Sequence, residues 1–419
     1  MNEYDVVIVG AGHAGVSCAA SLVEARYPGS IALIGDEKAL PYERPPLSKE
    51  FLKGDLEVED LALRGADWWK QSGVARELGA TVTRIDAAQR TLWTDRGEAY
   101  RYGSLVWAAG GQARRLPIPG NDLGGVHVVR TLDDAQSLKA NIQSARHAVI
   151  IGAGYIGLEA AASFRRHGLE TTVVEFLPRP LQRVAGEDIA DYLTHRHRAN
   201  GVHFAFNTQV QQIRGAGGRV ADVELVDGRV LPADVVIFGV GITPNTDVLA
   251  EAGADVADGV LVDDLCRTSL PHVFAIGDCA SIEWDSPTGR IRQESIQNAH
   301  EQARIVAGTI RGQAAVGERA VSWFWSNQYD IKVRTAGVLT GYDSAVLRGS
   351  PDSDKFSVVY LRGACVLAVD TVNNVRDFTQ AKSLVGHSIS VSVAELSDPA
   401  VDLKSLVSSA TVPRAVATR

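Results

Sequence analysis

The pattern of apolar and polar positions predicts a strand–turn–helix–strand unit at the start of the chain. An apolar run at Tyr4–Gly10 enters the turn GAGHAG, and the small-residue segment Val16–Ala25 has the character of a tightly packed helix. Ser30–Gly35 follows as a second strand, which ends at Asp36 and Glu37. We interpret this stretch as a βαβ unit.

The same pattern returns in the middle of the chain. His147–Gly152 leads into GAGYIG, an alanine-rich helix continues through Ser163, and the strand Glu170–Val174 ends at Glu175. Because the whole unit recurs, we predict two Rossmann-like dinucleotide-binding domains in one chain.

Three further apolar runs close on glycine, at Leu105–Gly110, Val235–Gly239 and Val273–Gly277. Such runs are typical of buried parallel strands whose carboxyl ends face a ligand. Later in the chain, alternation at Lys332–Val338 and Phe356–Leu361 predicts an antiparallel sheet. The expected fold class is therefore α/β with two dinucleotide-binding domains, followed by an α+β C-terminal domain.

Bulk composition narrows the class of protein. A length of 419 residues predicts several domains, and a net charge of −8 argues against a nucleic-acid partner. The four cysteines are far apart in sequence, so no spacing indicates a zinc site, an iron–sulfur site or a redox pair, and we expect no metal. Neither a secretory signal nor a membrane-length apolar run is evident, so we expect a cytoplasmic protein.

Both turns carry the G-x-G-x-x-G spacing between a strand and a helix. The glycines are Gly10, Gly12 and Gly15 in the first turn, and Gly152, Gly154 and Gly157 in the second. Glycine allows the tight turn, the approach of backbone to a pyrophosphate and close helix packing, while the helix N-terminus attracts the phosphates. Two such turns predict two dinucleotides, and FAD with NAD(P)H is the economical pair.

Acidic residues after each second strand predict how the ribose is held. Asp36 and Glu175 can accept hydrogen bonds from ribose hydroxyls, and a carboxylate repels a 2′-phosphate. Glu175 therefore favours NADH over NADPH. The nearby Arg179 and Arg183 could instead accept a phosphate.

Three segments carry a resemblance to a known family. They are PYERPPLSK at Pro41–Lys49, GDCA at Gly277–Ala280 and WFWSNQY at Trp323–Tyr329. In combination and in order they resemble the putidaredoxin-reductase family and the reductases of aromatic-ring dioxygenases. The resemblance implies a glutathione-reductase-like fold, with an FAD domain at 1–112 and 237–317, an NAD domain at 113–236 and a C-terminal domain at 318–419.

Site residues follow from the motifs and from the resemblance together. We assign to FAD Gly10, Gly12, Ala14, Gly15, Asp36, Lys49, Val82, Ala109, Arg130, Asp278, Ile296 and Trp325. We assign to NAD Gly152, Gly154, Tyr155, Ile156, Gly157, Glu159, Glu175, Arg183 and Gly241.

Four of these residues are candidates for a catalytic role. Lys49 could neutralise charge near the reduced flavin and could form a buried ion pair with Glu159. The resemblance implies that Tyr155 covers the nicotinamide pocket and that Trp325 closes the dimethylbenzene side of the flavin. Ordinary core packing is the competing interpretation for both aromatic residues. His13 is interpreted as a loop residue rather than an acid–base catalyst.

The expected reaction is electron transfer. Disulfide reductases and peroxidases of this fold need cysteine beside the flavin, and Leu40–Gly54 contains none. The resemblance implies a ferredoxin–NAD(+) reductase that serves a [2Fe-2S] ferredoxin, and through it a cytochrome mono-oxygenase or a Rieske-type dioxygenase. A flavin-dependent peroxide or disulfide reductase is one alternative, and a nicotinamide-sensing protein similar to apoptosis-inducing factor is another.

An acidic ferredoxin predicts a local basic docking patch. Candidates are Arg64, Lys70 and Arg304, although each could be ordinary surface charge. The resemblance also implies a monomer.

Overall fold

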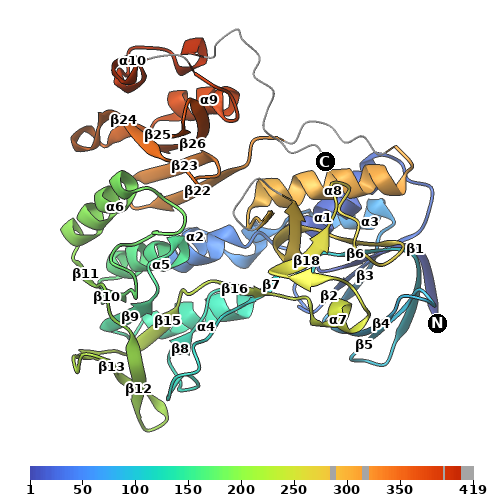
Figure 1. Cartoon of the computed structure of the whole chain (residues 1–419). Coiled ribbons are helices and arrows are strands. Elements are labelled where there is room, and N and C mark those ends of the chain that lie inside the picture. The colour runs from blue at the N-terminus through green and yellow to red at the C-terminus, as the bar shows by residue number, and fades with distance from the viewer. Residues whose placement is uncertain (284–288, 314–319, 390–391, 407–419) are drawn as a thin grey trace.

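A computed structural model describes residues 1–283, 289–313, 320–389 and 392–406. Three sheets organise the chain into three neighbouring bodies (Figure 1). The predicted fold class, two parallel-sheet dinucleotide domains and an antiparallel C-terminal sheet, is confirmed. The N-terminal Met1 to Gly35 stretch forms the first βαβ unit as expected.

The first body is built on a mixed sheet in the order β3-β2-β1-β6-β5-β4, with β19 also pairing with β6. Its strands are β1 (Asn2–Val9), β2 (Ile31–Gly35), β3 (Ala75–Leu78), β4 (Val82–Asp86), β5 (Thr91–Thr94), β6 (Ala99–Trp107) and β19 (Val273–Ala275). β1, β2, β3, β6 and β19 are parallel, whereas β4 and β5 form an antiparallel hairpin on the other half of β6. The prediction of buried parallel strands ending near Gly110 and Gly277 is therefore confirmed.

Helices α1 (His13–Glu24) and α8 (Ile296–Ile310) pack side by side against this sheet (Figure 1). Short helices α3 (Ala66–Ser72) and α7 (Asp247–Glu251) lie around it, whereas the short helix α2 (Glu50–Lys53) packs against helices of the second body. The remaining elements are the 3₁₀ turns η1 (Pro45–Ser48), η2 (Val58–Leu61) and η3 (Gly277–Cys279), and a small sheet of β17 (Val256–Ala257), β18 (Gly259–Val262), β20 (Ala280–Glu283) and β21 (Arg290–Arg292).

The second body repeats the dinucleotide-binding plan. Its parallel sheet has the order β11-β10-β9-β15-β8 and uses β8 (Val126–His127), β9 (His147–Ile151), β10 (Glu170–Val174), β11 (Val202–Ala205) and β15 (Val235–Phe238). Helices α4 (Leu132–Ile142), α5 (Tyr155–Arg166) and α6 (Glu187–Ala199) accompany it. A separate three-stranded sheet consists of β12 (Val210–Ala216), β13 (Arg219–Leu225) and β14 (Val230–Pro232).

Two strands connect these bodies, because the chain enters the second body through β7 (Gly111–Ala113) and leaves it through β16 (Ile242–Pro244). They pair with each other in an antiparallel ribbon. The expected boundaries at 112/113 and 236/237 fall inside β7 and β15, and all four residues of β15 pair with β9. We therefore propose boundaries just after Ala113 and Phe238. The boundary at 317/318 lies outside the described residues.

The C-terminal body is an antiparallel sheet in the order β22-β23-β26-β25-β24. Its strands are β22 (Trp323–Gln328), β23 (Ile331–Gly337), β24 (Ser344–Ser350), β25 (Lys355–Arg362) and β26 (Cys365–Val372), with α9 (Val375–Leu384), α10 (Val393–Ser397) and the 3₁₀ turns η4 (Pro351–Ser353) and η5 (Leu403–Leu406). The predicted antiparallel pairing is confirmed.

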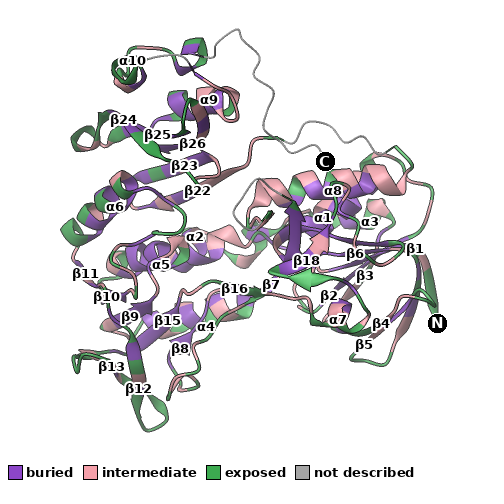
Figure 2. Ribbon diagram, in the orientation of Figure 1, coloured by how far each residue is buried: buried purple, intermediate pink, exposed green. Residues whose placement is uncertain are grey.

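Both faces of this C-terminal sheet are covered. In β25, every residue from Phe356 to Leu361 is buried, and the central strands of the sheets are mostly buried (Figure 2). One face packs on α5 and α6 of the second body in a shared core that includes Phe356, Val358 and Phe164. The opposite face packs under α9. The C-terminal sheet is thus fixed against the second body by a continuous apolar core.

Candidate flavin and nicotinamide site

The first glycine turn lies between β1 and α1. At two of its three glycines a side chain would clash with the backbone, and at the third it would not. Gly10 has φ +110°, and a Cβ there would lie 2.1 Å from the Ala108 oxygen. A Cβ at Gly15 would lie 1.9 Å from the Gly10 oxygen. At Gly12, by contrast, the nearest atom is Arg44 Nε at 3.8 Å. The middle glycine therefore leaves open space, as expected where a pyrophosphate passes close to the backbone.

The second turn, between β9 and α5, has the same division of roles. A Cβ at Gly152 would lie 2.5 Å from the Gly239 oxygen, and one at Gly157 would lie 2.2 Å from the Gly152 oxygen. For Gly154 the nearest atom is the Gly239 oxygen at 3.8 Å. Both turns thus fit a bound dinucleotide, with the free N–H groups of a helix N-terminus beside the open glycine.

Asp36 and Glu175, the acidic residues that follow the second strand of each unit, do not occupy equivalent positions. Gly10 N–H donates to the Ile34 carbonyl, and Gly152 N–H donates to the Val174 carbonyl, so Gly35 rather than Asp36 corresponds to Glu175. A Cβ at Gly35 would lie 2.7 Å from the Ala11 Cβ, which explains the glycine there. Asp36 lies one residue farther on and is exposed.

Glu175 is held firmly beside its glycine turn. Its carboxylate accepts from Ala153 N–H at 2.7 Å and from Leu177 N–H at 2.9 Å. Of the two neighbouring arginines, Arg179 donates to the Ala185 carbonyl at 3.1 Å, whereas Arg183 is exposed. The fixed carboxylate suits a ribose hydroxyl, and Arg183 is the arginine placed to meet solvent or a phosphate.

Lys49 and Glu159 form the buried ion pair that the sequence suggested. Lys49 Nζ lies 3.1 Å from Glu159 Oε1, and the two side chains are 7% and 3% exposed. Ser48 Oγ donates to Glu159 Oε2 at 2.9 Å, and Ser326 Oγ donates to Oε1 at 2.6 Å. Burial raises the pKa of Glu159, while the ammonium and the two hydroxyls oppose that shift. The pair lies where all three bodies meet, and its role toward a flavin stays a prediction.

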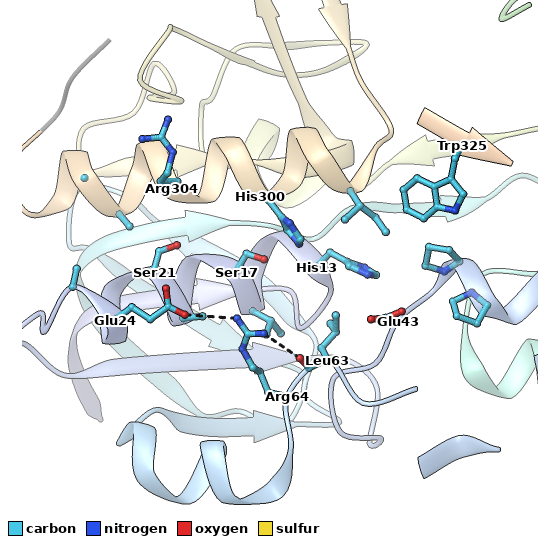
Figure 3. Close-up of a pocket in the computed structure, with 18 of the residues that line it drawn as sticks. His13, Ser17, Ser21, Glu24, Glu43, Leu63, Arg64, His300, Arg304 and Trp325 are labelled. Atoms are coloured by element: carbon cyan, nitrogen blue, oxygen red, sulfur yellow. Dashed lines mark hydrogen bonds and ion pairs between the residues drawn. The ribbon is translucent and has the colours of Figure 1, made fainter. Parts of the chain in front are cut away.

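A groove of about 1010 Å³ opens beside this pair, between α1, α8 and β22. Figure 3 shows His13 of α1, His300 and Arg304 of α8, and Trp325 of β22 around it. Lys49, Pro45, Pro46 and Ile296 also line it. Trp325 lines the same groove as Lys49, and its role beside a flavin stays a prediction, whereas Trp323 packs against Phe378 with ring centroids 5.8 Å apart.

His13 is the first residue of α1 and not the loop residue that the sequence predicts. Its Nε2 atom is buried and has no hydrogen-bond partner among the described residues. Burial lowers the pKa of His13 to about 4, and the neighbouring His300 acts in the same direction. The imidazole therefore remains neutral at physiological pH. An enclosed polar atom beside the first glycine turn is consistent with a ligand there.

Tyr155 begins α5, directly after the second glycine turn. Its ring lies 4.7 Å from the Phe324 ring, centroid to centroid, and its hydroxyl is enclosed near Thr335 and Asp370. Both interpretations of Tyr155 therefore have support, because the residue packs on the C-terminal sheet and also borders the nicotinamide turn. Ile156, next in the helix, is 45% exposed.

The other predicted flavin contacts are distributed around the first body. Arg130 and Asp278 form an ion pair at 3.1 Å, near the C-terminal ends of β6 and β19. Ala14 is buried against Gly277, and the Ala109 carbonyl accepts from Asn245 at 2.9 Å. The side chain of Val82 is buried in the core of the first sheet. Gly241 lies in the link between β15 and β16 with φ +90°.

Sequence reasoning missed several polar residues that complete the site. Ser48 and Ser326 bind Glu159, and although they lie within PYERPPLSK and WFWSNQY, neither was singled out there as a site residue. Arg44 donates to Glu37 at 2.7 Å and to the Arg130 carbonyl at 2.7 Å, joining the PYERPPLSK segment to the second body. Its place within that segment was a signal that could have singled it out.

No reactive thiol adjoins the groove within the described residues. Cys279 is buried, its thiol donates to backbone carbonyls, and burial raises its pKa to about 12. Burial likewise raises the pKa of Cys18 to about 12. Across the same described ranges, no group of three or more His, Cys, Asp or Glu residues is arranged to hold a metal ion. No helix in this part of the chain combines the length and apolar character needed to cross a membrane.

Two glycine turns of the dinucleotide-binding type and a buried ion pair at the junction of the bodies fit a flavin- and nicotinamide-dependent oxidoreductase. The family described as "pyridine nucleotide-disulphide oxidoreductase" matches residues 4–303, and "reductase C-terminal" matches residues 323–407. A ferredoxin–NAD(P)(+) reductase of Sphingomonas is 46% identical over 97% of this chain and 98% of its own length. Putidaredoxin reductase of Pseudomonas putida is 37% identical over 98% of each.

Solved structures agree with these sequence matches. A ferredoxin reductase from Rhodopseudomonas palustris superposes with a TM-score of 0.91 at 38% identity, covering 96% of this chain and 100% of that one. The putidaredoxin reductase of a covalent complex with putidaredoxin gives 0.92 at 36% identity, covering 97% and 98%. The chain belongs to the pyridine nucleotide-disulphide oxidoreductases and, within them, to the FAD-dependent ferredoxin reductases. The cofactors of this family are FAD and NAD(P)H, as the glycine turns predicted.

Proposed function

We propose that this protein oxidises NADH through bound FAD and passes the electrons one at a time to a [2Fe-2S] ferredoxin. Bound FAD supplies the chemistry, because it accepts a hydride and can release two electrons singly. The chain binds and orients the two cofactors through Gly12 and Gly154, and it places Lys49 and Glu159 at the junction of the three bodies. The observation that carries the proposal is this buried ion pair beside a groove with no reactive thiol among the described residues.

The preference for NADH rests on Glu175. Two backbone N–H groups fix its carboxylate, so it can accept from a 2′-hydroxyl without rearrangement and would repel a 2′-phosphate. We also propose that the protein acts in the cytoplasm, where NADH is available. We further propose that the protein acts as a monomer and that its ferredoxin supplies an oxygenase, as the p-cumate 2,3-dioxygenase name of one relative suggests for that relative.

The acceptor is proposed to dock along the groove of α1 and α8. Arg304 is exposed on α8 and Arg64 lies across the groove, where it pairs with Glu24 at 3.8 Å (Figure 3). Both can attract an acidic partner. Lys70 does not line the groove and pairs with Asp67 at 3.6 Å on α3, so it is removed from the proposed surface. Trp325 and Lys49 line the same groove.

The test uses the FAD-loaded protein with NADH and with cytochrome c as the final one-electron acceptor. We expect cytochrome c reduction to increase with added [2Fe-2S] ferredoxin and to saturate. A rate independent of ferredoxin would refute the proposed acceptor. Peroxide-dependent NADH consumption above simple oxidase leakage would instead support a peroxide reductase, and fast flavin reduction with slow turnover to every acceptor would support a nicotinamide sensor.

A further inference from the structure

Strand β22 has two faces with different surroundings. On one face, Trp325 and Asn327 line the groove beside α8. Together with Trp323 they also line a second, smaller pocket next to β23. Ser326 and Gln328 alternate with them, are fully buried and face α5 and α6 of the second body. One strand of the C-terminal body therefore contributes both Trp325 to the groove and Ser326 to the Lys49–Glu159 pair.

An unbroken line of hydrogen bonds starts at Glu159 and runs along the buried face of β22. Ser326 Oγ lies 2.6 Å from Glu159 Oε1, and Gln328 Nε2 lies 3.0 Å from Ser326 Oγ. His197 Nε2 lies 2.7 Å from Gln328 Oε1, and Tyr329 Oη lies 3.1 Å from His197 Nδ1. The line joins α5, β22 and α6.

The direction of each hydrogen bond follows from the carboxylate. An ionised Glu159 only accepts, so Ser326 must donate to it and must itself accept from the Gln328 amide nitrogen. The Gln328 oxygen then accepts from His197 Nε2–H, and Nδ1 accepts from Tyr329. Burial lowers the pKa of His197 to about 4, which keeps the ring neutral with a single N–H for this purpose. Every donor in the line points toward Glu159.

We propose that Ser326, oriented by Gln328 and His197, is a positioning residue that keeps Glu159 ionised against Lys49 and thereby sets the charge presented to the flavin. The amide of Gln328 interrupts any simple proton relay, so the line acts by orienting dipoles. The inference rests on the part of the proposed function that places FAD beside Lys49, and it does not depend on ferredoxin as the acceptor.

The consequence is electrostatic. An ionised Glu159 and a protonated Lys49 carry no net charge together, whereas a protonated Glu159 leaves the pair at plus one. Reduction by hydride adds one negative charge to the isoalloxazine system. A net positive pair would therefore favour the reduced flavin, because opposite charges attract strongly in a buried site. The other ionisable groups facing this carboxylate are Tyr155 on the same helix, Asp370 beyond it and His197 through Gln328.

The experiment measures the flavin midpoint potential as a function of pH in the FAD-loaded protein, without acceptor. Ser326→Ala removes one donor to the carboxylate, so protonation of Glu159 should move to higher pH by about one pH unit or more. The variant should show a more positive potential than wild type between the wild-type inflection and the new one, where only the variant has a protonated Glu159. The flavin absorption spectrum should change with pH over the same range.

Ser163→Ala is the matched control. Ser163 is equally buried on α5, but its hydroxyl contacts the backbone carbonyls of Ser48 and Glu159 instead of the carboxylate. Its potential should follow wild type at every pH. Ser326→Thr keeps the hydroxyl and should restore the wild-type profile, while Gln328→Leu should shift the profile in the same direction as Ser326→Ala.

The outcomes are distinguishable from those of the proposed function. Failure of wild type to bind FAD would overturn the proposed function itself. Normal FAD binding with identical potential profiles for wild type and Ser326→Ala would overturn this inference alone. A shift that appears equally in Ser163→Ala would also overturn it, because a general loss of packing would then explain the result.

Discussion

At the scale of single residues, Lys49 and Glu159 are the least ordinary feature of the chain. A buried ion pair seldom adds much net stability, because desolvation of both charges offsets their attraction. Here two serine hydroxyls are also committed to one carboxylate. A local arrangement with this cost is understandable where a nearby cofactor changes its charge during turnover.

The glycines of the first turn separate ligand binding from folding. Gly12→Ala places a Cβ in open space, so the apoprotein should keep its thermal stability while FAD binding weakens by at least about tenfold, or ~1.4 kcal/mol. Flavin fluorescence titration of the apoprotein measures this affinity. Gly15→Ala is the matched variant, and its clash with the Gly10 oxygen should lower the melting temperature of the apoprotein itself. Unchanged FAD affinity in Gly12→Ala would contradict the cofactor role of this turn.

Glu175 should determine which nicotinamide is used. Glu175→Ala removes the acceptor for a ribose hydroxyl, so the ratio of kcat/KM for NADH to that for NADPH should fall by roughly tenfold or more. Steady-state kinetics with both nucleotides measure it. Glu170→Ala, at the exposed start of the same strand, should leave the ratio unchanged. An unaltered ratio in Glu175→Ala would remove this residue from the ribose site.

At the scale of elements, the antiparallel ribbon of β7 and β16 and the strand β22 fix how the three bodies meet. The ribbon carries the chain into and out of the second body, and β22 brings Ser326 to α5. Next to this junction, β26 contributes Asp370, a fully buried carboxylate that accepts from Thr335 and from Tyr360. The sheet thus contains a second buried acid close to the candidate site.

Asp370 predicts a pH dependence of stability. Burial raises the pKa of Asp370 to about 6, above the value near 4 of an unfolded chain. Between these values the folded state binds more protons than the unfolded state. The stabilising contribution of Asp370 is therefore complete below about pH 4 and is lost as the pH rises through about 6. Asp370→Asn should therefore gain on the order of 3 kcal/mol in unfolding free energy relative to wild type between pH 4 and pH 7.

Denaturant unfolding across that pH range, at equal FAD loading, measures the difference. Asp352→Asn, at an exposed carboxylate of the same body, serves as control and should follow wild type. A constant difference between Asp370→Asn and wild type at all pH values would show that Asp370 does not titrate in this window.

At the scale of the whole molecule, a chain with net charge −8 would need a local basic surface to attract the acidic ferredoxin proposed as its partner. Steering of this kind depends on a few exposed cations near the electron exit and weakens as salt screens them. Arg304, exposed on α8 and lining the same groove as Trp325, is well placed for this role. Lys70 lies on α3 and does not line the groove, so we do not expect it to contribute to ferredoxin docking.

Arg304→Glu should raise the KM for ferredoxin by roughly tenfold at low salt, with the difference shrinking at high salt and with NADH-to-flavin reduction unchanged. Lys70→Glu reverses the same charge elsewhere and should change KM less than about twofold. Ferredoxin-dependent cytochrome c reduction at several salt concentrations provides the values. Equal effects of the two variants would indicate a general charge effect and contradict docking along α8.

The sequence alone determined those features that local chemistry enforces. Glycine spacing after an apolar strand has few other physical uses, so GAGHAG and GAGYIG established two dinucleotide domains, and alternation near Lys332 established the antiparallel sheet. The absence of cysteine from Leu40–Gly54 was visible in the same way. Tertiary structure decided what depends on distant segments meeting. It showed that Gly35, and not Asp36, matches Glu175, and that Ser48 and Ser326 converge on Glu159. A serine has no periodicity or spacing of its own, and its role comes only from the partner that folding brings within hydrogen-bond distance.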